Sequence, residues 1–381
     1  MPTRPRLLII SISRIVSDPR VLKQVRLFSA DYEVTTCGQG PAPDGVVAHL
    51  EIPSDARGWV DDRVALITRQ YTRAYENIQG VAAARHLLAG SRFDIVLAND
   101  LVTLPLALSL EPRLGVHADL HEFAPREKED LLGWRLFVAP FLRWICRRYL
   151  PRVASATTVA PGIARAYEKD YGVPFGVVTN AAPYADREPQ PVHSPIRMIH
   201  SAAGQRQRRL ENFIELMRDA PPGVELDLIV MPNEPDYVAE LKAAGATIPR
   251  LRFIDPVPYA QLVELVAGYD VSLNFLPPLS FNHRHALPNK FFEAVQARIG
   301  LVIGPSPEMV SILEQYGLGA VARDFEVDSL RDAIASMTPE LVAQWKEAAH
   351  RAARALSAEE QNRGWAEPIA AIAARRAEAA G

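Results

Sequence analysis

Hydrophobic runs of strand length alternate with stretches of helical period along the whole chain, which is typical of parallel α/β sheets. The first unbroken apolar run predicts a buried strand at 7–11. A loop over 12–17 follows, and then Asp18 and Pro19 predict a helix start, because Asp caps free backbone N–H groups and Pro suits the first helical turn. The remaining strands of this half are expected at 33–37, 94–98, 116–120, 156–160 and 176–179.

A second series of strands follows a break in the pattern. Residues 180–195 contain four prolines and show no periodicity, which is typical of a linker. The strands after it are expected at 197–200, 225–231, 251–254, 271–275, 301–303 and 319–322. We therefore expect two doubly wound, Rossmann-like α/β domains that face one another, over 1–188 and 189–356, and a helical, alanine-rich tail over 357–381.

The composition is that of an ordinary globular protein. Among 381 residues, 42 are basic and 45 acidic, with a net charge of −3, and 48% are hydrophobic. Nearly balanced charge argues against nucleic-acid binding, which depends on a basic surface. The two cysteines, Cys37 and Cys146, are too few for a disulfide framework or a cysteine metal site. The chain has no signal-like start and no apolar run near the roughly 20 residues that span a bilayer, so we expect a cytoplasmic protein.

The segment 287–294, LPNKFFEA, carries the strongest candidate chemistry. Pro288 and Asn289 precede a predicted helix whose first turn contains Lys290, and loops after parallel strands are where such sheets bind ligands. A helix N-terminus with an added lysine suits a phosphate. Glu293 lies on the same face and could accept hydrogen bonds from a sugar diol. The alternative is a solvated lysine with Glu293 in a capping box.

At these residues the sequence resembles a known family. PNKFFEAV followed by ARIGLVIGP is similar to the donor domain of nucleotide-sugar glycosyltransferases of GT-B fold, particularly family 4. Other segments resemble this family in the same order along the chain: SRIVSDPRVLKQVRLF, DIVLANDLVTLPLAL, DLHE, SATTVAPGIARAYEKDYGVPFGVVTNAAP, SAAGQRQRRLENFIELM, FIDPVPYAQLVELVAGYDVSLN and NRGWAE. The resemblance covers nearly the whole chain, and it implies a C-terminal helix that packs back toward the N-terminal domain.

The resemblance also implies roles on the donor side. Arg208, with Arg209 as its closest rival, and Lys290 with Asn289 would hold the donor diphosphate. Glu293 matches the second Glu of the family's E-x7-E motif and would bind the ribose hydroxyls.

Further roles follow for the sugar, the base and the acceptor. His285 stands where the family has the first Glu of that motif, near the transferred sugar, and this departure leaves the identity of the donor open. Pro256 and Val257 would flank the base. On the acceptor side the resemblance implies a role for His121 close to the reacting sugar. Two other residues on that side are Arg14 and Glu122.

The expected reaction moves a sugar from a nucleoside-diphosphate sugar, with a UDP-sugar favoured, to a hydroxyl of a sugar, a lipid-linked or a small-molecule acceptor. We expect retention of configuration, no metal and no other cofactor, with His121, Lys290 and Arg208 as the catalytic residues. Two alternatives keep the fold. One is a non-catalytic partner that binds a glycan or another transferase, and the other is a sugar-nucleotide epimerase.

Basic and aromatic residues interleave with helical period over 134–150. One interpretation is a helix that packs its aromatic side on the sheet. The other is peripheral contact with an anionic membrane at the inner face of the cell membrane.

Overall fold

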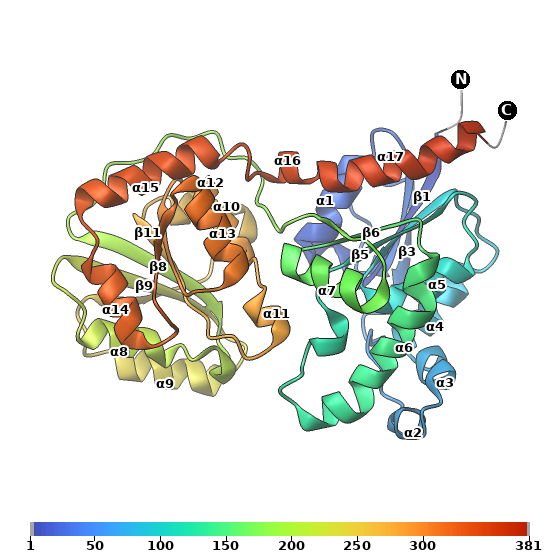
Figure 1. The fold of residues 1–381 in the computed structure, drawn as a ribbon, viewed down its shortest axis with the longest axis horizontal. Helices are drawn as coiled ribbons and strands as arrows, with labels where there is room; N and C mark the ends of the chain where they lie inside the picture. Colours follow the sequence, from blue (N-terminus) through green and yellow to red (C-terminus); the bar gives the residue numbers. More distant parts are fainter. Residues whose placement is uncertain (1–3, 379–381) are drawn as a thin grey trace. The chain divides into compact units, whose positions relative to one another are not determined.

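The computed structural model describes residues 4–378, which form two compact units (Figure 1). The N-terminal unit contains the chain up to Thr179, the short segment Ser280–Asn282 and the chain from Asn362 onward. The C-terminal unit contains Asn180–Leu279 and His283–Gln361. The units therefore divide at the start of the proline-rich stretch, earlier than the boundary at 188 drawn from the sequence.

A seven-stranded parallel sheet forms the middle of the N-terminal unit, in the order β3-β2-β1-β4-β5-β6-β7. Its strands are β1 (Arg6–Arg14), β2 (Glu33–Gln39), β3 (Ala48–Ile52), β4 (Ile95–Asn99), β5 (Gly115–Leu120), β6 (Ser155–Thr158) and β7 (Gly176–Val177). The predicted strands are confirmed, but β1 runs on to Arg14, so the loop expected over 12–17 was wrong in part. The sequence did not predict β3, since only Ile52 of this edge strand is buried and no apolar run marks it.

Helices connect these strands. The sequence-predicted start of α1 is confirmed: Asp18 accepts hydrogen bonds from the backbone N–H groups of Arg20 and Val21. The elements are η1 (Ile15–Ser17), α1 (Pro19–Phe28), α2 (Arg63–Ile67), α3 (Tyr71–Glu76), α4 (Gln79–Leu87), η2 (Leu101–Thr103), α5 (Leu104–Ser109), η3 (Ala124–Arg126), η4 (Trp134–Val138), α6 (Ala139–Tyr149), η5 (Leu150–Arg152), α7 (Pro161–Tyr171) and α17 (Arg363–Glu378). Among the described residues, no helix combines the length and the apolar character needed to cross a membrane.

The C-terminal unit is built on a six-stranded parallel sheet in the order β10-β9-β8-β11-β12-β13. Its strands confirm the second predicted series: β8 (Ile196–Ala203), β9 (Val224–Met231), β10 (Leu251–Ile254), β11 (Val271–Asn274), β12 (Gly300–Ile303) and β13 (Gly319–Val321). The helices are η6 (Arg206–Arg208), α8 (Glu211–Arg218), α9 (Pro235–Gly245), α10 (Tyr259–Val266), α12 (Asn289–Gln296), α13 (Pro307–Tyr316), α14 (Val327–Ala335), α15 (Pro339–Ala352) and α16 (Ala358–Gln361). The short helix α11 (Phe281–Arg284) is divided between the two units after Asn282.

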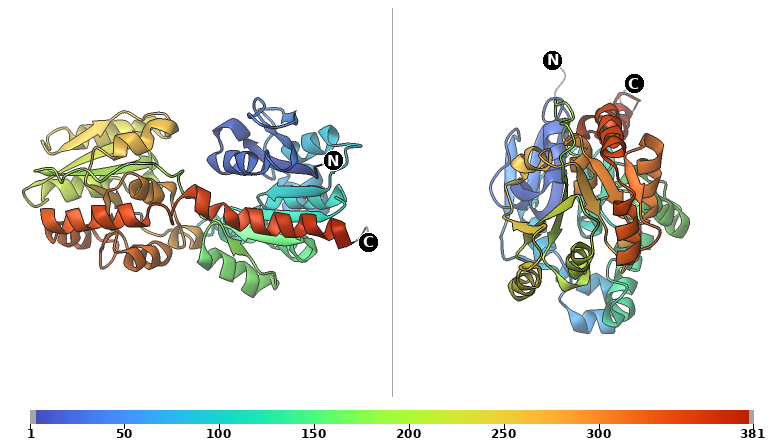
Figure 2. Two further views of the ribbon diagram at one scale, coloured as in Figure 1. Left: turned by 90° about the horizontal axis from the view of Figure 1, so that it is seen from above. Right: turned by 90° about the vertical axis from the view of Figure 1, so that its left-hand side faces the viewer.

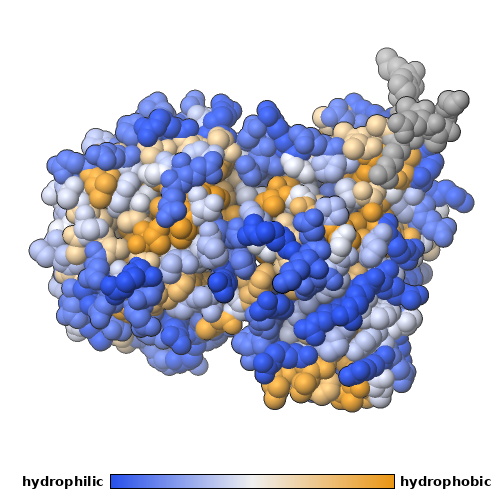
Figure 3. All heavy atoms as spheres, viewed as in Figure 1, coloured by the Kyte–Doolittle hydropathy of each residue, from blue (hydrophilic) through white to orange (hydrophobic). Residues whose placement is uncertain are grey.

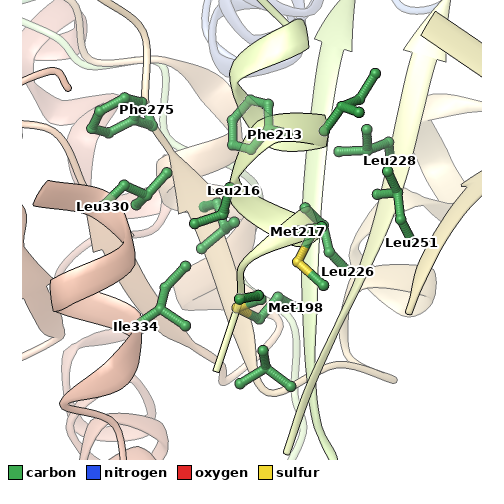
Figure 4. Close-up of a cluster of buried hydrophobic side chains, with 14 of the residues drawn as sticks. Met198, Phe213, Leu216, Met217, Leu226, Leu228, Leu251, Phe275, Leu330 and Ile334 are labelled. Carbon is green, nitrogen blue, oxygen red and sulfur yellow. The ribbon is translucent and has the colours of Figure 1, made fainter. Parts of the chain in front are cut away.

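The core of this unit lies between the sheet and its helices (Figure 4). Phe213 and Met217 on α8 pack with Met198 on β8, and Leu330 and Ile334 on α14 belong to the same buried cluster. In both sheets the strand order reverses beside the first strand, between β1 and β4 and between β8 and β11. Ligands of doubly wound sheets bind outside the carboxyl ends of strands at such reversals.

The C-terminal helix α17 completes the N-terminal unit, along which it lies (Figure 2, left). Trp365, Ile369 and Ile372 are fully or almost fully buried in the cluster that also contains Leu7 and Ile9 of β1. The helix passes Val178 so closely that a Cβ atom on Gly364 would lie 2.6 Å from the Val178 side chain. A larger residue at this position would therefore force either the helix or the Val178 side chain to shift.

A buried ion pair joins the first helix to the sheet of this unit. Arg20 on α1 is 5% exposed, and its Nε and Nη2 each donate to the Asp119 carboxylate on β5 over 2.7 Å. Arg20 also donates to the carbonyl of Val178 and stacks on the Trp365 ring, with the guanidinium carbon 4.7 Å from the ring centroid. Four segments distant in sequence therefore meet at one side chain.

Asp119 has further hydrogen-bond donors around it. Gln24 and Thr157 donate to its carboxylate over 2.8 and 2.7 Å. Burial alone would raise the pKa of Asp119, but the charge and hydrogen bonds of Arg20 outweigh it and hold this pKa well below its usual range. The pair is therefore ionised at neutral pH.

We expect Arg20→Met to lower the free energy of unfolding of this unit by about 3–5 kcal/mol, because the substitution leaves the Asp119 charge buried without its partner. Differential scanning calorimetry checks this prediction. Arg26→Met, on the exposed side of the same helix, is the matched control and should change stability by about 0.5 kcal/mol or less. Equal effects of the two substitutions would contradict the role given to the ion pair.

Candidate functional site

Lys290 lies in the first turn of α12 and reaches the carboxyl end of β8. Its Nζ donates to the carbonyl of Ser201 over 2.6 Å. Pro288 precedes the helix as its N-cap, and no side chain caps the first N–H groups. Burial and then the charge of Arg208 lower the pKa of Lys290 to about 8, against the opposite effect of Glu293. The positive charge of Lys290 is therefore only partly compensated by the negative charge around it.

Arg208 is the second cation of this region. It ends the short helix η6 after β8, is half-buried, and its buried Nε has no hydrogen-bond partner among the described residues. Burial lowers its pKa. The two neighbouring arginines are placed differently: Arg206 pairs with Glu240 at 2.6 Å, and Arg209 is exposed in a left-handed conformation with φ of 49°.

His200 lies close to these two cations and carries no charge itself. It is buried on β8, stacks on Phe213 with ring centroids 4.1 Å apart, and its Nδ1 lies 2.8 Å from the carbonyl oxygen of Leu273. Burial, together with the charges of Lys290 and Arg208, holds the pKa of His200 well below its usual range. The imidazole is therefore neutral, and the excess of positive charge at the end of β8, which suits an anion, comes from Lys290 and Arg208.

Glu293 is the one carboxylate that acts on the pKa of Lys290. It is 5% exposed, and burial raises its pKa to about 7 although Lys290 opposes the shift. Its charge and, more strongly, burial raise the pKa of Tyr259 to about 12. Tyr259 begins α10, which contacts α12. We call Arg208, Lys290, Glu293 and His200 the Lys290 cluster.

The other residues expected on this side lie in the same unit. Asn289 is the first residue of α12 and is partly exposed. Pro256 and Val257 lie in the loop that leads from β10 to Tyr259, so the chain brings them toward the neighbourhood of Glu293. Their roles stay predictions.

His285 occurs where the family motif would have a carboxylate, and it has a carboxylate as its partner. Its Nδ1 lies 2.9 Å from Oε1 of Glu308, in the first turn of α13, and both side chains are largely buried. A carboxylate is therefore present near position 285, but it belongs to Glu308 on α13 and lies behind the His285 imidazole.

A cavity of about 580 Å³ lies at the carboxyl ends of β4 and β5 in the N-terminal unit. Its walls combine aromatic and aliphatic side chains with a few titratable groups. The titratable residues of the lining are Asp100, His121, Glu122, Glu127 and Lys128, and the indole rings are those of Trp59 and Trp134. We call it the His121 cavity.

His121 is held between two carboxylates. Its Nδ1 is 3.3 Å from Asp100 and its Nε2 is 3.5 Å from Asp119. Burial alone would lower the pKa of His121, but the charge of Asp100 and the hydrogen bond with Asp119 outweigh it and raise this pKa. The two carboxylates therefore favour the protonated, hydrogen-bond-donating form of His121.

Asp100 adopts a strained backbone conformation, with φ of 65° and ψ of 156°. Its N–H donates to the carbonyl of Asp119 over 2.9 Å, and its carbonyl accepts from Thr103. Residues other than glycine hold such angles only where the surroundings impose them, often at functional sites.

Glu122 and Arg14 complete the predicted acceptor-side set. Loss of water around Glu122, then the charges of Glu127 and Asp100, raise its pKa to about 7. Arg14 is exposed at the end of β1 and is not part of the cavity lining formed by the described residues. The structure thus brings His121 and Glu122 together but places Arg14 elsewhere.

Asp100 and Glu308 are among the site residues that were absent from the sequence analysis. Asp100 lies two residues after the predicted strand 94–98, so the rule that ligands bind after strands could have found it. Glu308 gives no such signal, because only the fold brings it to His285. Within residues 4–378, no three His, Cys, Asp or Glu side chains gather so that they could hold a metal ion.

Solved structures similar to this chain span nearly its whole length. HepE from Anabaena in complex with UDP and glucose aligns with a TM-score of 0.68 and 13% identity, over 97% of this chain and 100% of the other. Sucrose-phosphate synthase from Thermosynechococcus elongatus aligns with a TM-score of 0.71 and 12% identity, over 97% of this chain and 100% of the other. WaaG, a glycosyltransferase involved in lipopolysaccharide biosynthesis, aligns with a TM-score of 0.65 and 13% identity, over 95% of this chain and 98% of the other. The fold is GT-B.

At the sequence level, no family model matches the chain and no curated protein is significantly similar to it. With identities this low, the GT-B likeness establishes the architecture, while residue roles depend on the local chemistry described above.

The paired carboxylates around His121 predict a measurable titration. NMR of its imidazole should give a pKa above the usual value of about 6.5. Asp100→Asn should lower this pKa, because it removes a charge that stabilises the imidazolium. Asp44→Asn, at an exposed position in a loop of the same unit, serves as control and should leave it unchanged. A histidine that titrates identically in all three proteins would argue against the arrangement.

Proposed function

We propose that this GT-B protein transfers a sugar from a nucleoside-diphosphate sugar to a hydroxyl acceptor. The observation that carries the proposal is the Lys290 cluster, in which Lys290 donates to the Ser201 carbonyl at the end of β8 and the buried Nε of Arg208 has no hydrogen-bond partner among the described residues. A diphosphate supplies the missing negative charge. The similarity of the fold to HepE, whose structures contain UDP and UDP-glucose, supports this donor class and favours a UDP-sugar.

In the proposed reaction, the bond from the anomeric carbon to the diphosphate breaks and a bond from that carbon to the acceptor oxygen forms. The electron pair of the broken bond stays on the diphosphate. Lys290, Arg208 and the N-terminus of α12 stabilise the charge that grows there. One cation at 4 Å contributes about 4 kcal/mol at an effective dielectric constant near 20. We therefore propose that these groups suffice without a metal.

Glu293 is proposed to bind the ribose hydroxyls of the donor. With a pKa of about 7, its carboxyl group can accept and donate hydrogen bonds near neutral pH, which suits a diol. We further propose that His285, oriented by Glu308, contacts the transferred sugar in place of the carboxylate expected there.

The acceptor is proposed to bind in the His121 cavity. Indole faces suit the apolar face of a sugar ring or a lipid-linked acceptor, and Glu122 offers an acceptor for the hydroxyl. The raised pKa of His121 favours its protonated form, which donates a hydrogen bond and does not accept the proton of that hydroxyl. This supports a same-face reaction with retention, in which the proton passes to the departing phosphate oxygen.

The first experiment measures transfer or hydrolysis with a panel of UDP-, GDP-, dTDP- and ADP-sugars. We expect one of them to react, and Lys290→Ala to lower turnover on the order of 10²-fold or more, by analogy with the loss of a charge-stabilising donor. Lys242→Ala, at an exposed position on α9, is the matched control and should retain activity.

Each other outcome has a distinct meaning. Turnover of Lys290→Ala within threefold of wild type, about 0.7 kcal/mol, would remove Lys290 from the diphosphate site. Formation of an epimer without acceptor would indicate an epimerase. Reaction with no member of the panel, together with glycan or protein binding, would indicate a non-catalytic partner.

The lowered pKa of Lys290 predicts how UDP binding depends on pH. Lys290 loses its proton as pH rises through about 8, so UDP affinity should fall about tenfold between roughly pH 7 and 9, with proton uptake on binding in this window. Isothermal titration calorimetry in two buffers measures both quantities. Lys290→Met should bind weakly with little pH dependence, whereas an equally steep dependence in this variant would assign the titration to another group.

A further inference from the structure

An exposed apolar surface lies at one end of the N-terminal unit. Six of the eleven large apolar side chains that are exposed in the described chain belong to α2 and to the segment 131–137. They are Val64, Ile67, Leu131, Leu132, Leu136 and Phe137, which are 39–62% exposed. We call these six residues the apolar end. Figure 3 shows hydrophobic side chains gathered at the lower edge of this unit, where Figure 1 labels α2.

The two parts of the apolar end are neighbours in space. Helix α2 contacts η4, which contains Leu136 and Phe137. The N–H of Arg135 donates to the carbonyl of Leu131, so the helical geometry extends back before η4 and places Leu132 and Leu136 one turn apart. The six side chains therefore form one surface rather than scattered exposures, and such surfaces usually mark an interaction site.

A strongly basic hollow borders this surface. Arg69, Arg143, Arg147 and Arg148 surround a pocket of about 570 Å³ whose walls also include Tyr71 and Trp144. We call it the arginine pocket. Arg69 lies two residues after the end of α2, and α6, which carries the other three arginines, follows directly after η4. The apolar end and the arginine pocket are thus continuous along both segments.

The positive charge of this region is not balanced. The segment 131–149 contains four arginines and no acidic residue, and the segment 63–75 contains three arginines and no acidic residue. Among residues 4–378, no carboxylate lies within 4.0 Å of any arginine of the pocket. The acidic groups that flank the segment 63–75 have other partners, because Asp62 pairs with Arg73 and Glu76 pairs with Arg85.

We propose that the apolar end and the arginine pocket dock this protein on a bilayer that contains anionic lipids. Such a bilayer offers phosphate groups and, a few ångströms deeper, acyl chains, which match the two adjacent parts of the surface. A free phosphate would leave the apolar end unexplained. A second copy of the chain, joined through the same face about a two-fold axis, would bring arginine pockets of like charge together.

The His121 cavity begins at the same two elements. Trp59 and Val60 precede α2, Trp134 begins η4, and all three line the cavity. A docked bilayer therefore lies beside the cavity. Under the proposed function, on which only this step rests, an acceptor anchored in the bilayer enters the cavity without leaving the membrane surface.

Vesicle co-sedimentation tests the docking without nucleotide or acceptor, so its result is independent of any transferase activity. Wild type should bind vesicles of phosphatidylcholine with about 30 mol % phosphatidylglycerol and bind pure phosphatidylcholine weakly. Arg143→Gln with Arg147→Gln should weaken partition about 30-fold, as expected for two basic residues at an anionic surface. Leu132→Ser with Leu136→Ser should also weaken partition into these vesicles. Its loss relative to wild type should be larger at high salt, where electrostatic attraction is screened.

Matched controls use exposed residues outside this surface. Arg26→Gln with Arg351→Gln removes two charges elsewhere, and Val47→Ser with Met231→Ser removes two exposed apolar groups. Both should bind vesicles like wild type, and circular dichroism establishes that all variants fold. The proposal would be overturned if wild type did not bind the vesicles or if the control variants lost binding. It would also be overturned if inorganic phosphate abolished binding while the leucine variant bound like wild type. A dimer that the leucine variant dissociates, without vesicle binding, would assign the surface to self-association.

Discussion

The N-terminal unit depends on the buried ion pair between Arg20 and Asp119. Arg20 joins α1 to β5, to the end of the sheet at Val178 and to Trp365 on the last helix. The same carboxylate of Asp119 lies beside His121. One interaction thus stabilises the fold and fixes the orientation of a candidate functional side chain. The charge state of His121 is consequently a property of the whole unit and not of its loop alone.

The C-terminal unit uses the opposite electrostatic arrangement. Lys290 donates to a backbone carbonyl, and among the described residues no carboxylate forms an ion pair with Lys290 or Arg208. Burial lowers the pKa values of both, and Glu293 opposes the shift only at Lys290, so their charges are incompletely compensated. The charged form of a group positioned in this way is destabilised before an anionic ligand binds. The group is already in place, so it does not have to move when the ligand arrives. This is the kind of preorganisation through which electrostatic sites accelerate reactions.

Local signals in the sequence predict most of the architecture. Apolar runs mark all the central strands, and Asp18 with Pro19 marks the start of α1, because these features depend on near neighbours. The edge strand β3 has no apolar run and could not be found in this way. Lys290 and Glu293 were visible because a helix start carries them. The pairing of Arg20 with Asp119, of Asp100 with His121 and of Glu308 with His285 was not, since each partner comes from another element.

The position of α17 has a consequence for how the chain is made. A ribosome releases the N-terminal strands first, but the surface of β1 that Trp365, Ile369 and Ile372 cover stays exposed until α17 emerges. The residues of the C-terminal unit, which end at Gln361, are complete before that moment. During synthesis, the half of the protein that is translated first is therefore the half that finishes folding last.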